Sequence, residues 1–408
     1  MIKFLNFQVI IFLIAILVVA CHSRIQTSNI SKSSYSTFNS NSNLLQECVQ
    51  TYNSKIDYFP DKISVNYAKG FVVEYHKNYK VVTLKNPWRN ADTTFQYVLL
   101  QCGTPVPKGF KKTQVIQVPI KKIVSLSTTH LPHLDKLGVI DQLIGISDAK
   151  RVNTDSVIKK IKAGQLVELG NDTNLNIEKL LELNPDLVMT YGVGNSNIDS
   201  YPKLLEAGLK VALNSEYMET SPLGRAEWLK FTALFFNLET KAEKVFGQIA
   251  KKYEAIAAKV KSVTTRPSVF VGLNFKGTWY MPTGNSYVAK YLADAGANYL
   301  WKDTKSSPNL PLSFEQVFER AANADYWLNL SLSWKTLQDV LAEDNRYADF
   351  KAVKNGNLYN NNARVNPNGG NDYWEGGISN PDLVLSDLIK IFHPELLPNH
   401  HLFYYRKL

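Results

Sequence analysis

The sequence predicts an α/β protein with two Rossmann-like lobes of mostly parallel sheet, one long helix joining them, and a small β-rich extension at the N-terminus. Three observations support this class. Short apolar strands alternate with short helices from residue 121 onward, a pattern typical of parallel sheets covered on both faces. A long amphipathic helix interrupts the alternation, which then resumes. Residues 44–115 show strand patterns only.

The long helix is expected at 240–263. Its apolar residues recur at steps of mostly three and four, the helical period: Ala242, Val245, Ile249, Tyr253, Ile256 and Val260. Thr240 and Glu243 have the spacing of a capping box, which marks the start of a helix. We therefore predict a stiff connection between an N-terminal lobe at 116–239 and a C-terminal lobe at 264–408.

Each lobe is built from short elements. In the N-terminal lobe we expect strands at 123–126, 143–146, 187–189 and 210–213, and helices at 131–137, 177–183, 201–207 and 222–236. In the C-terminal lobe we expect strands at 268–273 and 325–330, and helices at 287–295, 314–321 and 383–392. Ser313 and Gln316 have capping-box spacing at the start of the helix over 314–321.

The N-terminus carries a targeting pattern. Lys3 precedes an apolar run that ends in Val18-Val19-Ala20-Cys21, which resembles a bacterial lipoprotein signal. We expect residues 1–20 to be removed and Cys21 to receive lipid; a retained membrane anchor is the alternative. Residues 22–43 contain eight Ser and four Asn, so 21–43 is predicted to be a flexible tether.

The extension at 44–115 has strand patterns at 71–75, 80–84 and 93–101, which predict a small antiparallel sheet. Cys48 and Cys102 are the only cysteines besides Cys21. Because exported proteins commonly pair their remaining cysteines, we predict a disulfide between Cys48 and Cys102. Two buried thiols are the alternative.

Composition sets outer limits on function. The chain has 408 residues, 45% of them hydrophobic and 20% charged, and a formal net charge of +10, which suits a globular protein of two or three domains. A basic surface could favour anionic ligands, nucleic acid or anionic lipid, but no nucleic-acid motif is present. The sequence contains no P-loop and no Gly-x-Ser-x-Gly elbow.

Ligands of open α/β sheets bind beyond the carboxyl ends of the strands. In this sequence the segments that follow the predicted strands are rich in aromatic residues, which suits a flat, aromatic or chelate-like ligand. The predicted ligand-binding residues, in the groove between the lobes, are His130, Tyr191, Tyr217, Trp279, Tyr280, Trp334, Tyr359, Arg364 and Trp374. His130 and His133 could together ligate a metal, but no third ligand is evident nearby, so no metal site is predicted.

Four segments carry a family resemblance: Lys122-Ile-Val-Ser-Leu-Ser, Leu137-Gly-Val-Ile-Asp-Gln-Leu-Ile-Gly, Ile177-Glu-Lys-Leu-Leu-Glu-Leu-Asn-Pro-Asp-Leu-Val, and Pro381-Asp-Leu-Val-Leu-Ser-Asp-Leu-Ile-Lys-Ile-Phe-His-Pro-Glu. Their order and spacing resemble those of the substrate-binding proteins of ABC importers for ferric siderophores, haem and cobalamin. Residues 219–228 are also similar to iron-complex members of this group. The resemblance begins near residue 120 and does not cover the extension.

The resemblance implies a non-enzymatic, membrane-anchored receptor on the periplasmic side of the cell envelope. Such a receptor captures an iron chelate between its lobes and delivers it to an ABC permease, as a monomer with no resident cofactor and no nucleic-acid partner. Family members dock onto the permease through one acidic residue on each lobe. The matching positions here are Asp199 or Glu219 in the first lobe and Asp294 in the second.

Three alternatives stay open at this point. The same fold could bind haem or cobalamin instead of a siderophore. An exported hydrolase acting on an anionic substrate would use His130 with a carboxylate such as Glu219. An envelope scaffold would use the N-terminal sheet as its working surface.

Overall fold

The computed structural model describes residues 42–110, 115–171, 174–195, 197–305 and 309–408. The predicted signal segment 1–20, the predicted lipid site Cys21 and nearly all of the tether lie outside these residues. Within the described part of the chain, no helix combines the length and the apolar character needed to span a membrane.

The N-terminal lobe contains a five-stranded parallel sheet in the order β7-β6-β5-β8-β9. Its strands are β5 Ile123–Ser125, β6 Leu143–Ile146, β7 Val167–Glu168, β8 Leu187–Thr190 and β9 Val211–Leu213. Its helices are α1 Leu131–Leu137, α2 Asp155–Lys162, α3 Ile177–Leu183, α4 Tyr201–Glu206 and α5 Pro222–Leu234. Successive residues of β5 enter different apolar clusters, Ile123 one and Val124 another, so the sheet is buried on both faces.

The C-terminal lobe has a second five-stranded sheet in the order β13-β10-β15-β16-β17, parallel except for β17, and a three-stranded antiparallel sheet in the order β11-β12-β14. The strands are β10 Ser268–Val271, β11 Asn274–Phe275, β12 Thr278–Pro282, β13 Asn298–Tyr299, β14 Asn309–Leu312, β15 Tyr326–Leu328, β16 Leu358–Asn360 and β17 Arg406–Lys407. The helices are α7 Tyr287–Asp294, α8 Phe314–Ala321, α9 Leu337–Glu343, α10 Lys351–Lys354, α11 Gly376–Ser379 and α12 Pro381–Phe392. The predicted α/β class with mostly parallel sheets is confirmed, and so is the capping box at the start of α8.

The three predicted strands of the N-terminal sheet are antiparallel, and a fourth strand that was not predicted joins them in parallel. Strands β1 Phe71–Tyr75, β2 Tyr79–Leu84 and β3 Phe95–Gln101 are antiparallel, but β4 Val115–Val118 adds to β3 in parallel. Cys48 and Cys102 form a disulfide with a Cα–Cα distance of 4.8 Å. The sheet packs on α5, where the Phe71 ring lies 5.0 Å from that of Trp228. It therefore shares an apolar cluster with the N-terminal lobe.

The long helix α6 spans Glu239–Ala258, so the expected end at residue 263 is five residues too late. The expected capping box at its start is also wrong, because no side chain caps this helix. Glu243 instead accepts a hydrogen bond from the backbone N–H of Ser64 at 2.7 Å and pairs with Lys230 at 3.0 Å. Contacts with residues distant in sequence thus take the carboxylate that the local pattern assigned to the cap.

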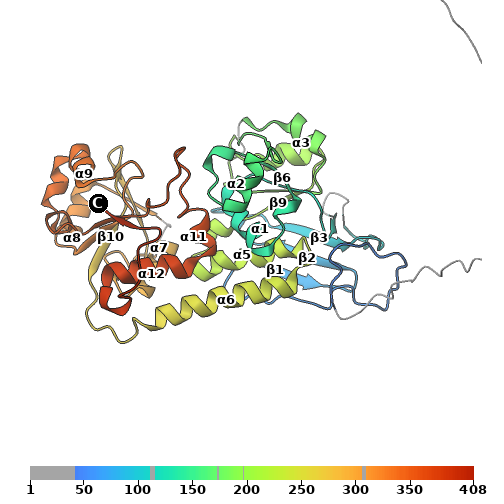
Figure 1. Ribbon diagram of the computed structural model, residues 1–408, viewed down its shortest axis with the longest axis horizontal. Helices are drawn as coiled ribbons and strands as arrows, with labels where there is room; N and C mark the ends of the chain where they lie inside the picture. Colours follow the sequence, from blue (N-terminus) through green and yellow to red (C-terminus); the bar gives the residue numbers. More distant parts are fainter. Residues whose placement is uncertain (1–41, 111–114, 172–173, 196, 306–308) are drawn as a thin grey trace, which may run out of the picture. The chain divides into compact units, whose positions relative to one another are not determined.

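Helices α5 and α6 lie side by side (Figure 1). Both helices contribute residues to two apolar cores. From α5, Ala226 packs in the core of the C-terminal lobe and Leu229 packs in the core of the N-terminal lobe. From α6, Tyr253 packs in the first of these cores and Ala242 in the second. All thirteen residues of α5 are buried, so this helix is interior along its whole length.

A fully buried ion pair holds the corner between these helices. Lys80 Nζ on β2 lies 2.7 Å from Glu239 Oε1, and neither side chain is exposed to solvent. The same ammonium donates to the carbonyl of Leu234 at 2.7 Å and to Asn237 Oδ1 at 3.0 Å. Burial lowers the pKa of Lys80, and the Glu239 carboxylate opposes that shift.

Replacement of Lys80 by Ala should leave the buried Glu239 carboxylate without its cationic partner. Removing one partner of a buried pair typically costs about 3–5 kcal/mol, so we expect a loss of this size in the free energy of unfolding, measured by urea denaturation. Lys85→Ala, one residue beyond β2 and exposed, is the matched control and should change stability by less than about 0.5 kcal/mol. Equal stabilities of the two variants would contradict the role given to the pair.

Candidate ligand-binding site

A cavity of about 450 Å³ lies at the carboxyl edge of the N-terminal parallel sheet. Segments that follow all five strands line it: Leu126, Ser127, Thr128 and Thr129 after β5; Ser147, Asp148 and Arg151 after β6; Asn171 after β7; Tyr191 and Val193 after β8; and Glu216 and Tyr217 after β9. Arg225 of α5 and Trp374 of the C-terminal lobe complete the lining. The cavity therefore draws on both lobes.

The strand order explains why the cavity forms at this edge. The chain runs outward from β5 to β6 and β7, then returns to the other side of β5 for β8 and β9. The segments that leave β5 and β8 thus diverge to opposite faces and open a crevice between them, the usual ligand position in open α/β sheets. Ser127 and Tyr191 follow these two strands and both line the cavity.

One wall of the cavity carries a buried ion pair. An Arg225 guanidinium nitrogen lies 3.6 Å from Glu216 Oε1, and both side chains are less than one-tenth exposed. Burial raises the pKa of Glu216, and the charge of Arg225 opposes this shift. The guanidinium also lies 4.5 Å from the ring centroid of Tyr287 on α7. Its buried Nε has no hydrogen-bond partner among the described residues.

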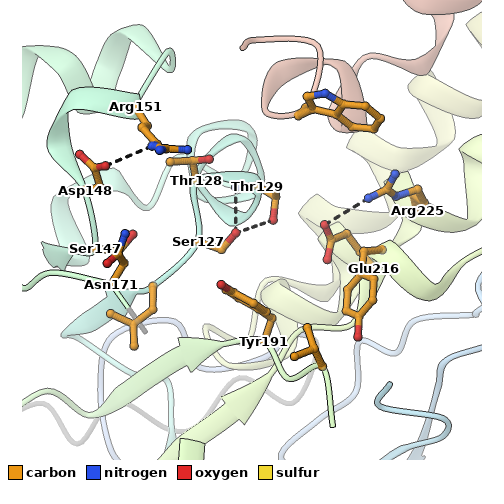
Figure 2. Close-up of a pocket in the computed structure, with 14 residues that line it drawn as sticks. Ser127, Thr128, Thr129, Ser147, Asp148, Arg151, Asn171, Tyr191, Glu216 and Arg225 are labelled. Atoms are coloured by element: carbon orange, nitrogen blue, oxygen red, sulfur yellow. Dashed lines mark hydrogen bonds and ion pairs between the residues drawn. The ribbon is translucent and has the colours of Figure 1, made fainter. Parts of the chain in front are cut away.

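The opposite wall is polar and more open. Arg151 pairs with Asp148 at 3.3 Å, with the Arg151 side chain 65% exposed. Figure 2 shows this pair and the Glu216–Arg225 pair on opposite sides of the cavity, with the hydroxyl groups of Ser127 and Thr129 between them. These two hydroxyl oxygens lie 2.9 Å apart. The cavity thus offers cationic groups, hydroxyl groups and aromatic rings to one ligand.

The loop that leaves β8, residues 191–195, is held in place from three sides. The Tyr217 hydroxyl donates to the carbonyl of Gly192 at 2.6 Å. The Asp199 carboxylate accepts from the N–H groups of residues 193, 194 and 195 at 2.7–3.1 Å. The Trp88 ring of the N-terminal extension packs against Gly192 and Gly194 so closely that a Cβ at Gly194 would lie 2.5 Å from it.

A second contact joins the lobes beside Trp374. The Glu375 carboxylate accepts from the backbone N–H groups of Asn153 at 2.9 Å and Thr154 at 2.7 Å, at the start of α2. Asn366 Nδ2 donates to the carbonyls of Lys150 and Val152 at 3.1 and 3.2 Å. The loop of the C-terminal lobe that carries Trp374 is therefore anchored on the N-terminal lobe.

Of the residues that the sequence predicted for the site, Tyr191, Tyr217 and Trp374 line this cavity. Trp279 and Trp334 are buried in the core of the C-terminal lobe, where Trp279 Nε1 donates to the carbonyl of Val271 at 2.8 Å. These two indoles therefore have no ligand-facing surface. Trp279 is buried because β12 belongs to an antiparallel sheet, which the sequence pattern did not indicate, and Trp334 packs against the Trp327 ring, with the centroids 6.2 Å apart.

The remaining three C-terminal residues also lie outside the cavity. Tyr280 is 55% exposed on β12. Tyr359 packs against Tyr326, with the ring centroids 6.2 Å apart. Arg364 pairs with Asp372 at 2.7 Å and lines a different cavity.

His130 is fully buried below the site rather than within it. Its Nδ1 lies 3.3 Å from Ser125 Oγ, and its Nε2 is buried without a partner among the described residues. Burial lowers the pKa of His130, and that of the equally buried His133, to about 3, so both imidazoles are neutral at physiological pH. Within the described ranges no group of three or more His, Cys, Asp or Glu side chains is placed to hold a metal ion.

The three acids expected to dock onto a permease are occupied within the protein. Asp199 is 5% exposed and holds the loop after β8. Glu219 is 6% exposed and accepts from Trp228 Nε1 at 3.0 Å and from the N–H groups of residues 69–70 at 2.9 and 2.8 Å. Asp294 accepts from the Tyr253 hydroxyl at 2.7 Å and pairs with Lys290. These three carboxylates therefore bind groups within the protein itself and do not form a free acidic surface.

Eleven of the fourteen lining residues were not among the predicted site residues, and six of these eleven are Ser147, Asp148, Arg151, Asn171, Glu216 and Arg225. Five of these six follow β6, β7 or β9, so the same carboxyl-end rule could have found them. It was applied mainly to aromatic residues. Arg225 lies in the first turn of α5, and no local signal distinguishes it from a surface arginine.

Gly194→Ala tests the contact between the extension and the site. Gly194 has φ +78° and lies against Trp88, whereas Gly208 has φ +80° and open space where a Cβ would lie. Gly208→Ala therefore measures the backbone strain alone. We expect Gly194→Ala to lower the free energy of unfolding by about 1–3 kcal/mol more than Gly208→Ala, in urea titrations of both, because it overpacks the Trp88 contact. Equal losses in the free energy of unfolding would show that the contact between Gly194 and Trp88 does not affect stability.

Glu375→Gln tests the contact between the lobes. Burial raises the pKa of Glu375 from 4.5 to about 7, although hydrogen bonds from Thr154 and Asn153 oppose this shift. Over this pH range the folded state retains a proton that the unfolded chain releases. The contribution of Glu375 to stability should therefore fall as pH rises from 4.5 to 7, by up to about 3 kcal/mol.

The measurement is the difference in free energy of unfolding between the wild type and Glu375→Gln, from urea titrations at several pH values. We expect this difference to fall between pH 4.5 and 7 and to stay level above. A difference that rises over the same range would mean that the hydrogen bonds from Asn153 and Thr154 outweigh burial.

Comparison with known proteins places this architecture. The family model described as "Periplasmic binding protein" matches residues 123–364. An uncharacterized lipoprotein of Methanocaldococcus jannaschii is 30% identical over 354 residues, covering 81% of this chain and 82% of the relative. An uncharacterized ABC transporter substrate-binding lipoprotein of Bacillus subtilis is 26% identical over 195 residues, covering 43% of this chain and 59% of the relative.

Among solved structures, a possible iron-binding (periplasmic solute-binding) protein from Staphylococcus epidermidis is similar with a TM-score of 0.53 and 20% identity, covering 67% of this chain and 98% of that one. At this identity the likeness shows the fold alone. The family model covers more than half of the chain, and it begins at β5, the first strand of the N-terminal parallel sheet. The chain therefore belongs to the periplasmic binding protein family.

Proposed function

We propose that this chain is the membrane-anchored substrate-binding receptor of an ABC importer, which captures an iron chelate and delivers it to the permease. The observation that supports the proposal most is the position of the cavity. It lies at the switch point of a parallel sheet in one lobe, and Trp374 of the other lobe completes its lining. Two lobes that contribute to one cavity are what a capture-and-release receptor requires.

The cavity chemistry favours a small, partly aromatic and polar ligand. Its volume of about 450 Å³ falls within the range of small-molecule sites. Tyr191, Tyr217 and Trp374 offer ring faces, and the buried Arg225 offers a guanidinium edge that suits anionic oxygen atoms. A chelate brings its own donor atoms for the metal, so the protein needs to recognise only the outer surface of the complex.

Location and delivery follow from the same proposal. The lipoprotein-like segment ending at Cys21 and the lipoprotein relatives support a lipid-anchored position in the cell envelope. The permease partner is inferred from the family resemblance and from the substrate-binding name of the Bacillus subtilis relative. A monomeric receptor with its cavity facing the permease would complete the transfer.

The hydrolase alternative receives no support from the site. It required a histidine and a carboxylate in contact with the substrate. His130 is fully buried, and the Glu219 carboxylate is occupied by N–H donors of the fold. A haem or cobalamin ligand instead of a siderophore is the alternative that the same cavity allows, and the ligand test below separates these classes.

The test is a titration of the purified protein with ferrichrome, ferric enterobactin, haem and cyanocobalamin, followed by intrinsic tryptophan fluorescence. We expect saturable quenching by one class of iron chelate. Absence of saturable quenching by all four would refute the proposed ligand class. Saturation by cyanocobalamin alone would replace the iron chelate with a corrinoid.

Substitution of Trp374 localises the binding. In calorimetric titrations with the ligand that quenches, Trp374→Ala should weaken binding about tenfold, because a ring face in the cavity is lost. Tyr280→Ala is the control, since Tyr280 is an exposed aromatic of the same lobe outside the cavity. Equal affinities of the two variants would place the ligand elsewhere.

A further inference from the structure

A second cavity, of about 610 Å³, adjoins the first and shares Tyr217 and Arg225 with it. Three segments of the chain form most of its lining, which Arg225 of α5 and Asn309 of β14 complete. One wall comes from residues 217–220 after β9, and a second from residues 282–288 before and at the start of α7. The third wall comes from the N-terminal extension, through residues 69–70 and the loop 86–91.

The third wall lies outside the segment that the family model matches. Residues 69–70 and 86–91 precede residue 123, where the family match begins. The backbone joins these two segments, because the N–H of Lys85 donates to the carbonyl of Gly70 at 2.7 Å. The extension thus adds a wall to a space that residues of both lobes also line.

The loop 86–91 is held in place by contacts with the N-terminal lobe. The Trp88 ring stacks on Tyr201 with the ring centroids 5.7 Å apart and packs against Gly194. The carbonyl of Pro87 accepts from the Ser215 hydroxyl at 2.8 Å. Arg89 follows Trp88 directly, so its backbone position is set by these contacts while its side chain stays exposed.

The compartment is cationic. Lys69, Arg89 and Arg225 line it, and Glu219 is the only acid among its lining residues. The Glu219 carboxylate already accepts three N–H donors, from residues 69 and 70 and from Trp228. Among the described residues Lys69 and Arg89 form no ion pair, so positive charge is in excess in the lining of the compartment.

We propose that the N-terminal extension supplies a second compartment of the ligand site, in which Arg89 and Lys69 receive a carboxylate-bearing arm of a chelate whose body lies in the first cavity. This inference rests on the proposed function. Arg225 and Tyr217 stand at the boundary between the two cavities, so one ligand can contact both. Arginine matches the two oxygen atoms of a carboxylate, which gives the compartment a preference for that group.

The test uses two pairs of iron complexes that differ in their carboxylates. N-succinyl ferrioxamine B carries a carboxylate where N-acetyl ferrioxamine B carries none. Haem carries two, and its dimethyl ester, measured in the same dilute detergent, carries none. Calorimetric titration of the full chain gives an affinity for each. We expect the carboxylate member of a pair that binds to bind at least tenfold more tightly than its neutral partner, with a preference that shrinks at high salt.

Three variants distinguish the effect of a charge in the compartment on binding from the effect of the overall charge of the protein. Arg89→Gln should reduce the carboxylate preference to less than threefold and leave binding of the neutral partner within twofold. Arg89→Lys should retain most of the preference. Arg266→Gln removes the same charge at an exposed position outside both cavities and should change nothing.

The possible results distinguish failure of the proposed compartment from failure of the proposed function. If one pair binds but both members bind equally, or if Arg89→Gln and Arg266→Gln behave alike, the compartment is refuted and the proposed function stands. If none of the four complexes binds and the titrations of the preceding section are also negative, the proposed function fails and the compartment fails with it. If those titrations find a ligand but these four do not bind, the carboxylate-bearing class is refuted.

Discussion

The corner between α5 and α6 is the constraint on which the rest of the structure depends. Lys80 places its ammonium on the last carbonyl of α5, at Leu234, while Glu239 is the first residue of α6. The negative end of one helix dipole and the positive end of the next therefore each face a charge of opposite sign. Both charges are fully buried, so the pair tolerates little change in the angle between the helices.

The corner affects the geometry of the site because helix α5 belongs to both. The C-terminal end of α5 is fixed by Lys80, and its first turns carry Arg225 to the boundary of the two cavities. A second buried network acts at its middle. Lys230 pairs with Glu227 and Glu243, and Glu227 accepts three backbone N–H groups of residues 66–68. The segment that leads to Lys69 is thereby attached to the helix that positions Arg225.

Local patterns in the sequence were sufficient for the parallel sheets and for part of the site. Alternating apolar strands and helices predicted the class, and the carboxyl-end rule found Tyr191 and Tyr217. The rule failed at Trp279, because it locates the end of a strand but not the direction of a side chain. It also assumed parallel strands, and β12 lies in an antiparallel sheet.

The predictions for the acidic residues failed for another reason. Asp199, Glu219 and Glu243 each look like free or capping carboxylates when only neighbouring residues are considered. In the structure each accepts backbone N–H groups, and for Glu219 and Glu243 the donors lie about 150 or more residues away in sequence. A buried N–H without a partner costs about 1–3 kcal/mol, so such long-range pairing is selected by the fold and leaves no local signature.

The two lobes are joined on more than one side of the cavity, and this affects how a ligand is bound. Helices α5 and α6 pack into both cores, while Glu375 and Asn366 connect the loop around Trp374 to the start of α2. A hinge movement large enough to enclose a ligand would have to break one of these sets of contacts. Binding therefore depends on a cavity that is already formed, and a preformed cavity spends little free energy on reorganisation. The compartment supplied by the extension fits this mode of binding, because loop 86–91 is held by Trp88 before any ligand arrives.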